Sequence, residues 1–211
     1  QEFPANKFWD FDYLEKNTPQ RIHVDHRSGQ PRGQFWWAGD SGEVSMFWYT
    51  YQSRWLPLAL FEKKNAKNFS QILFDATRLW EGGFELHFNK GLAGASIDAI
   101  EKGRETPMNP AVYDAAALII TGAGKQGIFP GLNSYAVNES EAREQIRKVS
   151  AAMKIITDAT PESGSYLNEA DYFQKNWQHA FWGKHYPRLL KIKQKYDPNG
   201  LFKCHHSVGS E

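Results

Sequence analysis

The sequence predicts an α+β fold, an antiparallel sheet with helices on one face, and three features of the residue pattern support it. Residues 43–55 are rich in aromatic and β-branched side chains, which favour strands. Residues 66–80 place apolar side chains at helical spacing. Residues 84–88 alternate apolar with polar side chains, as a half-buried strand does. The pattern therefore changes from strand to helix and back to strand.

The beginning of the chain is predicted to contain a hairpin. Residues 1–33 are polar and irregular and end in a turn-rich run, so no regular structure is expected there. The aromatic stretches 34–39 and 43–55 flank a turn, and they are predicted to pair as a β-hairpin. Both faces of this hairpin are aromatic, which indicates that helices or another domain cover it.

The middle of the chain is predicted to add a helix and further strands. The helix over 66–80 is expected to end at Gly82 and to pack on the sheet. Residues 84–89 are expected to add an antiparallel strand to that sheet. A short helix over 96–103 and a nearly continuous apolar strand over 113–121 follow.

The end of the chain is predicted to be helical. The clearest helix spans residues 140–156, where apolar side chains recur at alternating spacings of four and three. Two further helices are predicted at 169–182 and 187–196, and the second of these opens with Pro187. A C-terminal helical tail is therefore expected after the sheet.

The composition excludes several classes of protein. The 211 residues suffice for one domain or two small ones, and no stretch approaches the ~20 apolar residues of a membrane span. A net charge of +1 gives no electrostatic argument for binding nucleic acid or an anionic membrane. The single Cys204 excludes an internal disulfide framework. The aromatic fraction of 15% suits either a large core or a ligand groove.

The start of the chain and two sequons bear on its origin. The chain begins at Gln1 without a Met, so we expect a processed or excised product. Asn-X-Ser triplets begin at Asn68 and Asn138, and each has the form of a glycosylation acceptor. Such triplets also arise by chance, so the glycosylation of either asparagine stays open.

Two groupings resemble functional motifs but favour structural explanations. Residues 122–127 have the glycine spacing of a dinucleotide-binding loop, yet Ile-Phe-Pro-Gly follows instead of a helix start. A turn leaving a strand is therefore favoured. His23 and His26, and the Cys-His-His run at 204–206, lack the three or four spaced ligands of a zinc site. No metal site is predicted.

The aromatic stretch 47–55 allows two interpretations. In a strand, Tyr49 and Tyr51 face one way, and Gln52 and Arg54 face the other. One interpretation is a fully buried strand whose phenols are satisfied internally. The other is one wall of a cleft for a planar or sugar-like ligand, and the residues alone leave both open.

The last fifty residues contain a specific combination of motifs. These are Tyr-x-Asn at 166–168, Trp-Gly-x-x-Tyr at 182–186 and Asp-Pro-Asn-Gly at 197–200. In this order and spacing they resemble the C-terminal segment of the berberine-bridge-enzyme-like FAD-linked oxidases, which belong to the vanillyl-alcohol-oxidase superfamily. Stretches at 35–39 and 87–94 extend the resemblance to fungal secreted members of that family.

This resemblance implies a protein of two lobes. An N-terminal lobe holds most of the FAD and is absent from this chain. A substrate-binding sheet with its helices, here residues 1–160, covers the flavin, and residues 161–211 return to complete the flavin lobe. The chain is therefore expected to be the C-terminal portion of a secreted oxidase, with the missing FAD lobe and a small-molecule substrate as its partners.

The resemblance also implies roles for single residues. Tyr166 takes the position of the general base. Asn168 takes that of a residue that holds the backbone geometry or makes a polar contact beside the flavin. Tyr49, Tyr51 and Arg54 are candidates for the substrate pocket. Local sequence alone indicates only an exposed tyrosine at position 166. A phenol acts as a base only where positive charge or hydrogen bonds stabilise the phenolate.

The implied function is the oxidation of an alcohol, a sugar or a related donor by hydride transfer to flavin, with oxygen as acceptor. The isolated chain is expected to be inactive, to carry no flavin adduct and to expose a large apolar surface. The alternative is a cofactor-free fragment that binds a ligand or a partner.

One position departs from the pattern of the family. Many relatives have Asn where this chain has His185, so no cofactor role is expected at that position.

Overall fold

The structure, a computed structural model, describes residues 4–40, 47–88, 92, 94–125 and 138–211. The chain forms two compact units, Gln1–Trp48 with Gly124–Asn138 and Tyr49–Ala123 with Glu139–Glu211. The units do not follow the segments 1–160 and 161–211, which rest on the family resemblance and stay a prediction.

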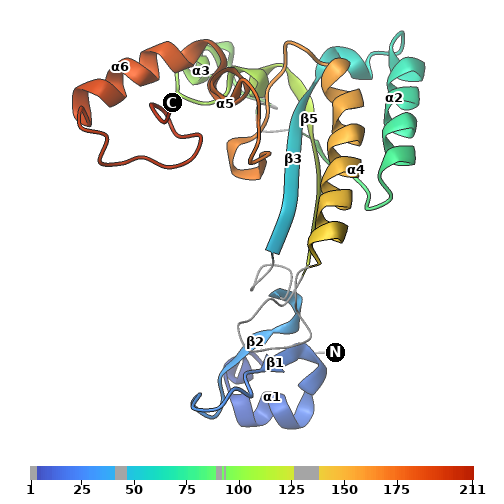
Figure 1. Cartoon of the computed structure of the whole chain (residues 1–211), viewed down its shortest axis with the longest axis vertical. Coiled ribbons are helices and arrows are strands. Elements are labelled where there is room, and N and C mark those ends of the chain that lie inside the picture. Colours follow the sequence, from blue (N-terminus) through green and yellow to red (C-terminus); the bar gives the residue numbers. More distant parts are fainter. Residues whose placement is uncertain (1–3, 41–46, 89–91, 93, 126–137) are drawn as a thin grey trace. The chain divides into compact units, whose positions relative to one another are not determined.

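Over its described residues, the first unit contains the α-helix α1, three 3-10 helices and a two-stranded sheet (Figure 1). Its elements are the 3-10 helices η1 (Ala5–Lys7), η2 (Pro19–Arg21) and η3 (Ala38–Asp40), helix α1 (Phe11–Asn17), and strands β1 (Ile22–Val24) and β2 (Phe35–Trp37). Asp10 caps α1, because its carboxylate accepts a hydrogen bond from the amide of Tyr13 at 3.0 Å. The expectation that residues 1–33 are irregular is wrong, since α1 and β1 are too short to show a sequence period.

The predicted hairpin between residues 34–39 and 43–55 is also wrong. β2 pairs antiparallel with β1 and not with the strand that follows it. Between β1 and β2, Gly29 and Gly33 have φ angles of +86° and +89°, a conformation that lets the chain reverse without steric cost. Residues 41–46, which include the start of the second predicted strand, lie outside the described residues.

The second unit contains a three-stranded sheet in the order β3-β5-β4. Its strands are β3 (Phe47–Pro57), β4 (Glu85–Phe88) and β5 (Ala115–Lys125). β4 pairs antiparallel with β5, with Glu85 opposite Ile120. The strands predicted over 43–55 and 84–89 therefore share one sheet, but β5 lies between them.

The helices of the second unit follow the predicted pattern with one exception. They are η4 (Leu58–Phe61), α2 (Ala66–Leu79), α3 (Ile97–Arg104), η5 (Pro110–Tyr113), α4 (Glu139–Asp158), η7 (Leu167–Glu169), α5 (Trp177–Trp182), η8 (Gly183–His185) and α6 (Tyr186–Tyr196). The helices predicted at 66–80, 96–103, 140–156 and 187–196 are confirmed, and so is the α+β class. Within the described part of the chain, no helix has the length and apolar character to cross a membrane.

The exception is the helix predicted over 169–182, of which only α5 forms. The carboxylate of Asp171 accepts a hydrogen bond from the amide of Phe173 at 3.0 Å and closes a turn. Asn176 then has a left-handed φ of 50°. Both features interrupt a helix, so local turn chemistry overrides the apolar spacing here.

The glycine run at 122–127 also differs from the prediction. β5 extends to Lys125, so residues 122–125 belong to a strand and not to a turn. Residues 126 and 127 lie outside the described part of the chain.

The main core lies between the sheet and the helix pair α2 and α4, which pack against each other (Figure 1). Its buried side chains are Leu56, Phe69, Ala76, Trp80, Ala117, Ile119, Ala123, Val149, Ala152, Met153 and Ile156. Each large aliphatic side chain buried in this way contributes ~1.5–3 kcal/mol. The helical stripes seen in the sequence therefore face the sheet and hold its shape.

Trp80 joins the end of α2 to the sheet through a hydrogen bond. Its indole N–H donates to Thr121 Oγ1 at 2.9 Å, and that hydroxyl donates to the carbonyl of Gly83 at 2.7 Å. Gly82 leaves room for the indole ring, because a Cβ at this position would lie 2.1 Å from the ring carbon Cζ2. The glycine is therefore required by a close approach.

We expect Gly82→Ala to lower the free energy of unfolding by about 1–3 kcal/mol, because the added methyl group must displace a buried ring. Urea unfolding followed by tryptophan fluorescence measures the loss. Gly39→Ala is the matched control, since a Cβ at Gly39 meets no atom within 4 Å. Equal losses in the two variants would contradict this account of Gly82.

Candidate functional site

Residues 163–166 lie along β3 and lead into the Tyr-x-Asn motif. The amide of Trp55 donates to the carbonyl of Gly164 at 2.9 Å. Ser163 Oγ donates to the carbonyl of Trp55 at 2.6 Å. Both polar backbone groups of Trp55 in β3 therefore form hydrogen bonds with this segment.

The same segment is held on its other side by α5. The amide of Ser165 donates to the carbonyl of Ala180 at 2.8 Å, and Asn109 Nδ2 bridges the carbonyls of Ser165 and Ala180 at 3.1 and 2.8 Å. A Cβ at Gly164 would lie 2.5 Å from the carbonyl oxygen of Ala180. Only glycine fits this close approach, so Gly164 lets the segment fit between β3 and α5.

The structure brings the predicted base and the predicted flavin contact together. Asn168 Nδ2 donates a hydrogen bond to Tyr166 Oη at 2.8 Å. The two residues belong to the turn around η7, and Tyr166 is 37% exposed. The Tyr166 ring lies beside the indole of Trp55, with ring centroids 6.1 Å apart. A phenol oxygen that accepts an amide N–H is thus presented at the surface of the second unit.

Tyr51 lies near the same turn but in different surroundings. Burial raises the pKa of the Tyr51 hydroxyl, and the carboxylates of Glu169 and Glu85 raise it further; Glu169 also accepts its hydrogen bond. Negative charge beside a phenol disfavours the phenolate. Tyr51 therefore keeps its proton and ties η7 to β3.

Tyr49 and Arg54 point to other parts of the second unit. Tyr49 packs against the main core, and burial together with the charge of Glu141 raises the pKa of its hydroxyl. Arg54 is buried, and it donates to Thr160 Oγ1 at 3.0 Å and to the Thr160 carbonyl. Burial lowers the pKa of the Arg54 guanidinium to about 10, so it stays charged at neutral pH. Its hydrogen bonds fix the chain after α4.

Ser53 and Glu169 are among the residues at this site that were not singled out in the sequence. Ser53 accepts the amide of Tyr166 at 3.0 Å, and Glu169 accepts the hydroxyl of Tyr51. The alternation along β3 was the available signal, because Tyr51, Ser53 and Trp55 occupy every second position and share one face. The alternation does not show which segment of the chain contacts that face.

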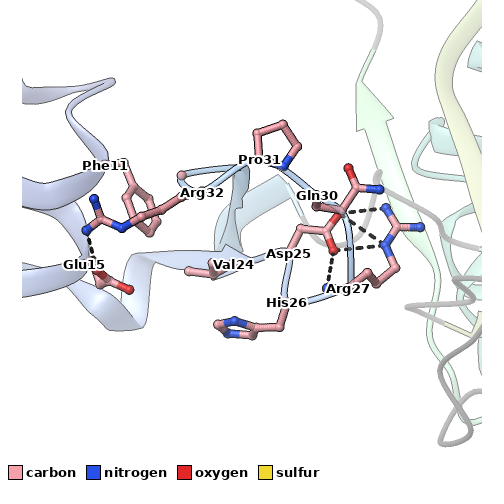
Figure 2. A pocket seen from close by; sticks show the side chains of 10 residues that line it. Phe11, Glu15, Val24, Asp25, His26, Arg27, Gln30, Pro31 and Arg32 are labelled. Atoms are coloured by element: carbon pink, nitrogen blue, oxygen red, sulfur yellow. Dashed lines mark hydrogen bonds and ion pairs between the residues drawn. The ribbon is translucent and has the colours of Figure 1, made fainter.

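The first unit has a hollow of about 270 Å³ between α1 and the turn that joins β1 to β2. Figure 2 shows the side chains that line it. Its arginines are engaged in ion pairs, Arg27 with Asp25 at 2.7 Å and Arg32 with Asp12 at 2.6 Å. No predicted site residue lines it.

The histidines of the C-terminal run form a stack of rings. His205 stacks on Tyr172 with centroids 4.0 Å apart and on His206 at 3.8 Å, and His206 stacks on Trp177 at 5.3 Å. Over the residues that the structure describes, no three His, Cys, Asp or Glu side chains gather closely enough to hold a metal ion. His185 Nε2 is buried without a hydrogen-bond partner among those residues.

Comparisons with known proteins converge on one family. Residues 165–209 match the family model described as berberine and berberine like. The chain is 36% identical over 110 residues to the FAD-linked oxidoreductase ffsJ of Aspergillus flavipes. This match covers 52% of this chain and 17% of the relative. It is 49% identical over 53 residues to a VAO-type flavoprotein oxidase of Thermothelomyces thermophilus, covering 25% of this chain and 9% of the relative. The chain thus spans less than a fifth of these relatives.

Solved structures have the same fold. A VAO-type flavoprotein from Myceliophthora thermophila C1 superposes with a TM-score of 0.58 and 25% identity, covering 76% of this chain and 27% of that protein. A carbohydrate oxidase from Microdochium nivale superposes with a TM-score of 0.51 and 20% identity over 76% of this chain and 33% of that protein, a likeness of fold alone. Together with the motif order, these matches show that the chain is similar, in its C-terminal segment and in its fold, to berberine-bridge-enzyme-like proteins of the vanillyl-alcohol-oxidase superfamily.

Proposed function

We propose that this chain forms the substrate-side, C-terminal half of an FAD-dependent oxidase. The enzyme would oxidise an alcohol, a sugar or a related donor by hydride transfer and pass the electrons to oxygen. The hydrogen bond from Asn168 Nδ2 to Tyr166 Oη at 2.8 Å is the observation that supports this most directly, because it lies in the segment matching the family model. The name of the similar flavoprotein oxidase supports oxygen as the acceptor.

In this proposal Tyr166 is the general base. Hydride leaves the carbon of an alcohol readily only when the alcohol oxygen loses its proton. The partial exposure of Tyr166 lets a substrate hydroxyl reach its phenol oxygen. The amide N–H of Asn168 is bonded to that oxygen and holds it in one direction, toward an incoming hydroxyl. The alcohol then becomes a carbonyl as its hydride departs.

FAD, when bound, supplies the acceptor for that hydride. The residues here fit its reactive end: Tyr166 and Asn168 are accessible, and the buried indole N–H of Trp55 beside them has no partner among the described residues. The glycine run does not form the phosphate-binding loop of a dinucleotide fold, because residues 122–125 lie within β5 and not at the start of a helix. We therefore assign the phosphates to the other lobe.

The surface of the second unit supports a contact with that lobe. Large side chains of the C-terminal segment are exposed, among them Tyr172, Phe173, Leu201 and Phe202. Apolar surface of this kind is covered in most stable proteins.

We also propose that the protein is secreted and glycosylated. The exposure of the two sequon asparagines, Asn68 and Asn138, supports this.

We expect Tyr166→Phe, made in the full-length FAD-containing protein, to slow flavin reduction by about 10²–10⁴-fold with little change in substrate binding. The variant removes the oxygen that takes the proton and keeps the ring. Stopped-flow absorbance of the flavin at several pH values measures the rate. Tyr196→Phe, at another exposed tyrosine, is the control and is expected to match the parent. Equal rates in Tyr166→Phe and the parent would remove Tyr166 from the mechanism.

We expect Asn168→Ala to slow flavin reduction by about 10–10²-fold, because the Tyr166 hydroxyl loses the amide that orients it. Stopped-flow absorbance of the flavin measures the rate. Asn17→Ala also removes one exposed amide hydrogen bond, from Asn17 Nδ2 to the carbonyl of Tyr13, and should leave the rate unchanged. A parent rate in Asn168→Ala would refute the role of the amide.

A further inference from the structure

Ser53 binds both polar backbone groups of Tyr166. Its Oγ accepts the Tyr166 amide at 3.0 Å, and its hydroxyl donates to the Tyr166 carbonyl at 3.4 Å. A serine hydroxyl can make both bonds at once, because it has one hydrogen to donate and two lone pairs to accept with. Ser53 is 4% exposed, so solvent has little access to replace either bond.

The place of Ser53 in β3 makes these bonds part of a longer contact. Trp55, two residues further along, bonds to Ser163 and Gly164. Tyr51, two residues earlier, bonds to Glu169 beyond the Tyr-x-Asn motif. The strand therefore holds the segment before, at and after Tyr166, and Ser53 holds the residue itself.

We propose that Ser53 is a positioning residue for the oxidation assigned to this site, because it fixes the backbone from which the Tyr166 phenol projects. The inference rests on the proposed function of Tyr166. A phenol oxygen takes a proton efficiently only when it is held within hydrogen-bond reach of the substrate hydroxyl. A displacement of about 1 Å is enough to slow a reaction by about 10²-fold.

The position of the Tyr166 backbone also determines the bond that Asn168 makes. The amide of Glu169 donates to the carbonyl of Tyr166 at 3.0 Å, the same carbonyl that Ser53 contacts. This turn places Asn168 Nδ2 at 2.8 Å from Tyr166 Oη. Loss of the Ser53 hydroxyl thus removes the bonds that hold the Tyr166 backbone. It also loosens the start of the turn that carries Asn168, the hydrogen-bond donor to the Tyr166 phenol.

Ser163 provides a matched control for this inference. It is also a buried serine, 7% exposed, and its hydroxyl also joins β3 to residues 163–166. Its bond goes to the carbonyl of Trp55 and not to Tyr166. Ser163→Ala therefore removes a comparable hydrogen bond from the same contact and leaves the bonds of Tyr166 in place.

The test compares Ser53→Ala with Ser163→Ala in the full-length FAD-containing protein. Hydrogen exchange at the Tyr166 amide reports the bond directly and needs no substrate. We expect this amide to exchange about 10-fold or more faster in Ser53→Ala and at the parent rate in Ser163→Ala. Flavin reduction should fall by about 10–10²-fold in Ser53→Ala with KM within about twofold of the parent. Ser163→Ala should reduce its flavin at a rate within about twofold of the parent.

Two variants keep the test decisive. Ser53→Thr keeps the hydroxyl and should restore slow amide exchange and fast flavin reduction. If Ser53→Ala does not fold, Ser53→Cys nearly keeps the volume but bonds weakly, and it should still reduce its flavin at least about fivefold more slowly. Equal effects in Ser53→Ala and Ser163→Ala would overturn the inference, since they would show a merely structural hydroxyl.

The outcomes also separate this inference from the proposed function. If Tyr166→Phe slows flavin reduction while Ser53→Ala speeds amide exchange and leaves the rate unchanged, the positioning role is wrong and the base stands. If Tyr166→Phe leaves flavin reduction unchanged, the base assignment is wrong, and the positioning role of Ser53 falls with it.

Discussion

The placement of residues 163–166 between β3 and α5 is the constraint on which the site depends. Gly164 meets the carbonyl of Ala180 so closely that no side chain fits, and Trp55 bonds to the same residue from the other side. Because this short stretch is held from two directions, the next residues leave it in a defined direction. Tyr166 and Asn168 are therefore held in place although both are exposed.

The two phenols near this turn have opposite surroundings, and the difference separates their roles. Tyr51 is half-buried beside carboxylates, and its hydroxyl donates a hydrogen bond to Glu169. Tyr166 is at the surface, and its oxygen accepts an N–H from Asn168. Tyr51 thus joins η7 to β3, whereas the Tyr166 oxygen is accessible, as the proposed general base must be.

The sequence predicted elements whose side chains face one continuous core, and it failed where a partner or a turn decided the structure. The stripes of α2 and α4 were visible because each helix buries one face against the sheet. The partner of β2 was mistaken, since alternation shows which side chains share a face and not which strand they meet. Tyr166 and Asn168 were found through the family motif. Their contacts with β3 join residues 113 positions apart in the chain, which no local pattern reveals.

The central claim, that Tyr166 accepts the substrate proton, is tested most directly by replacing Tyr166 with a fluorinated tyrosine in the full-length FAD-containing protein. Fluorine makes a phenol more acidic and changes its size little, so the hydrogen bond to Asn168 is kept. The pH profile of flavin reduction is then measured for the parent and the fluorinated protein. The account predicts that the rise of the rate moves to lower pH by the difference in acidity between the two phenols. A profile that does not move would show that another group takes the proton.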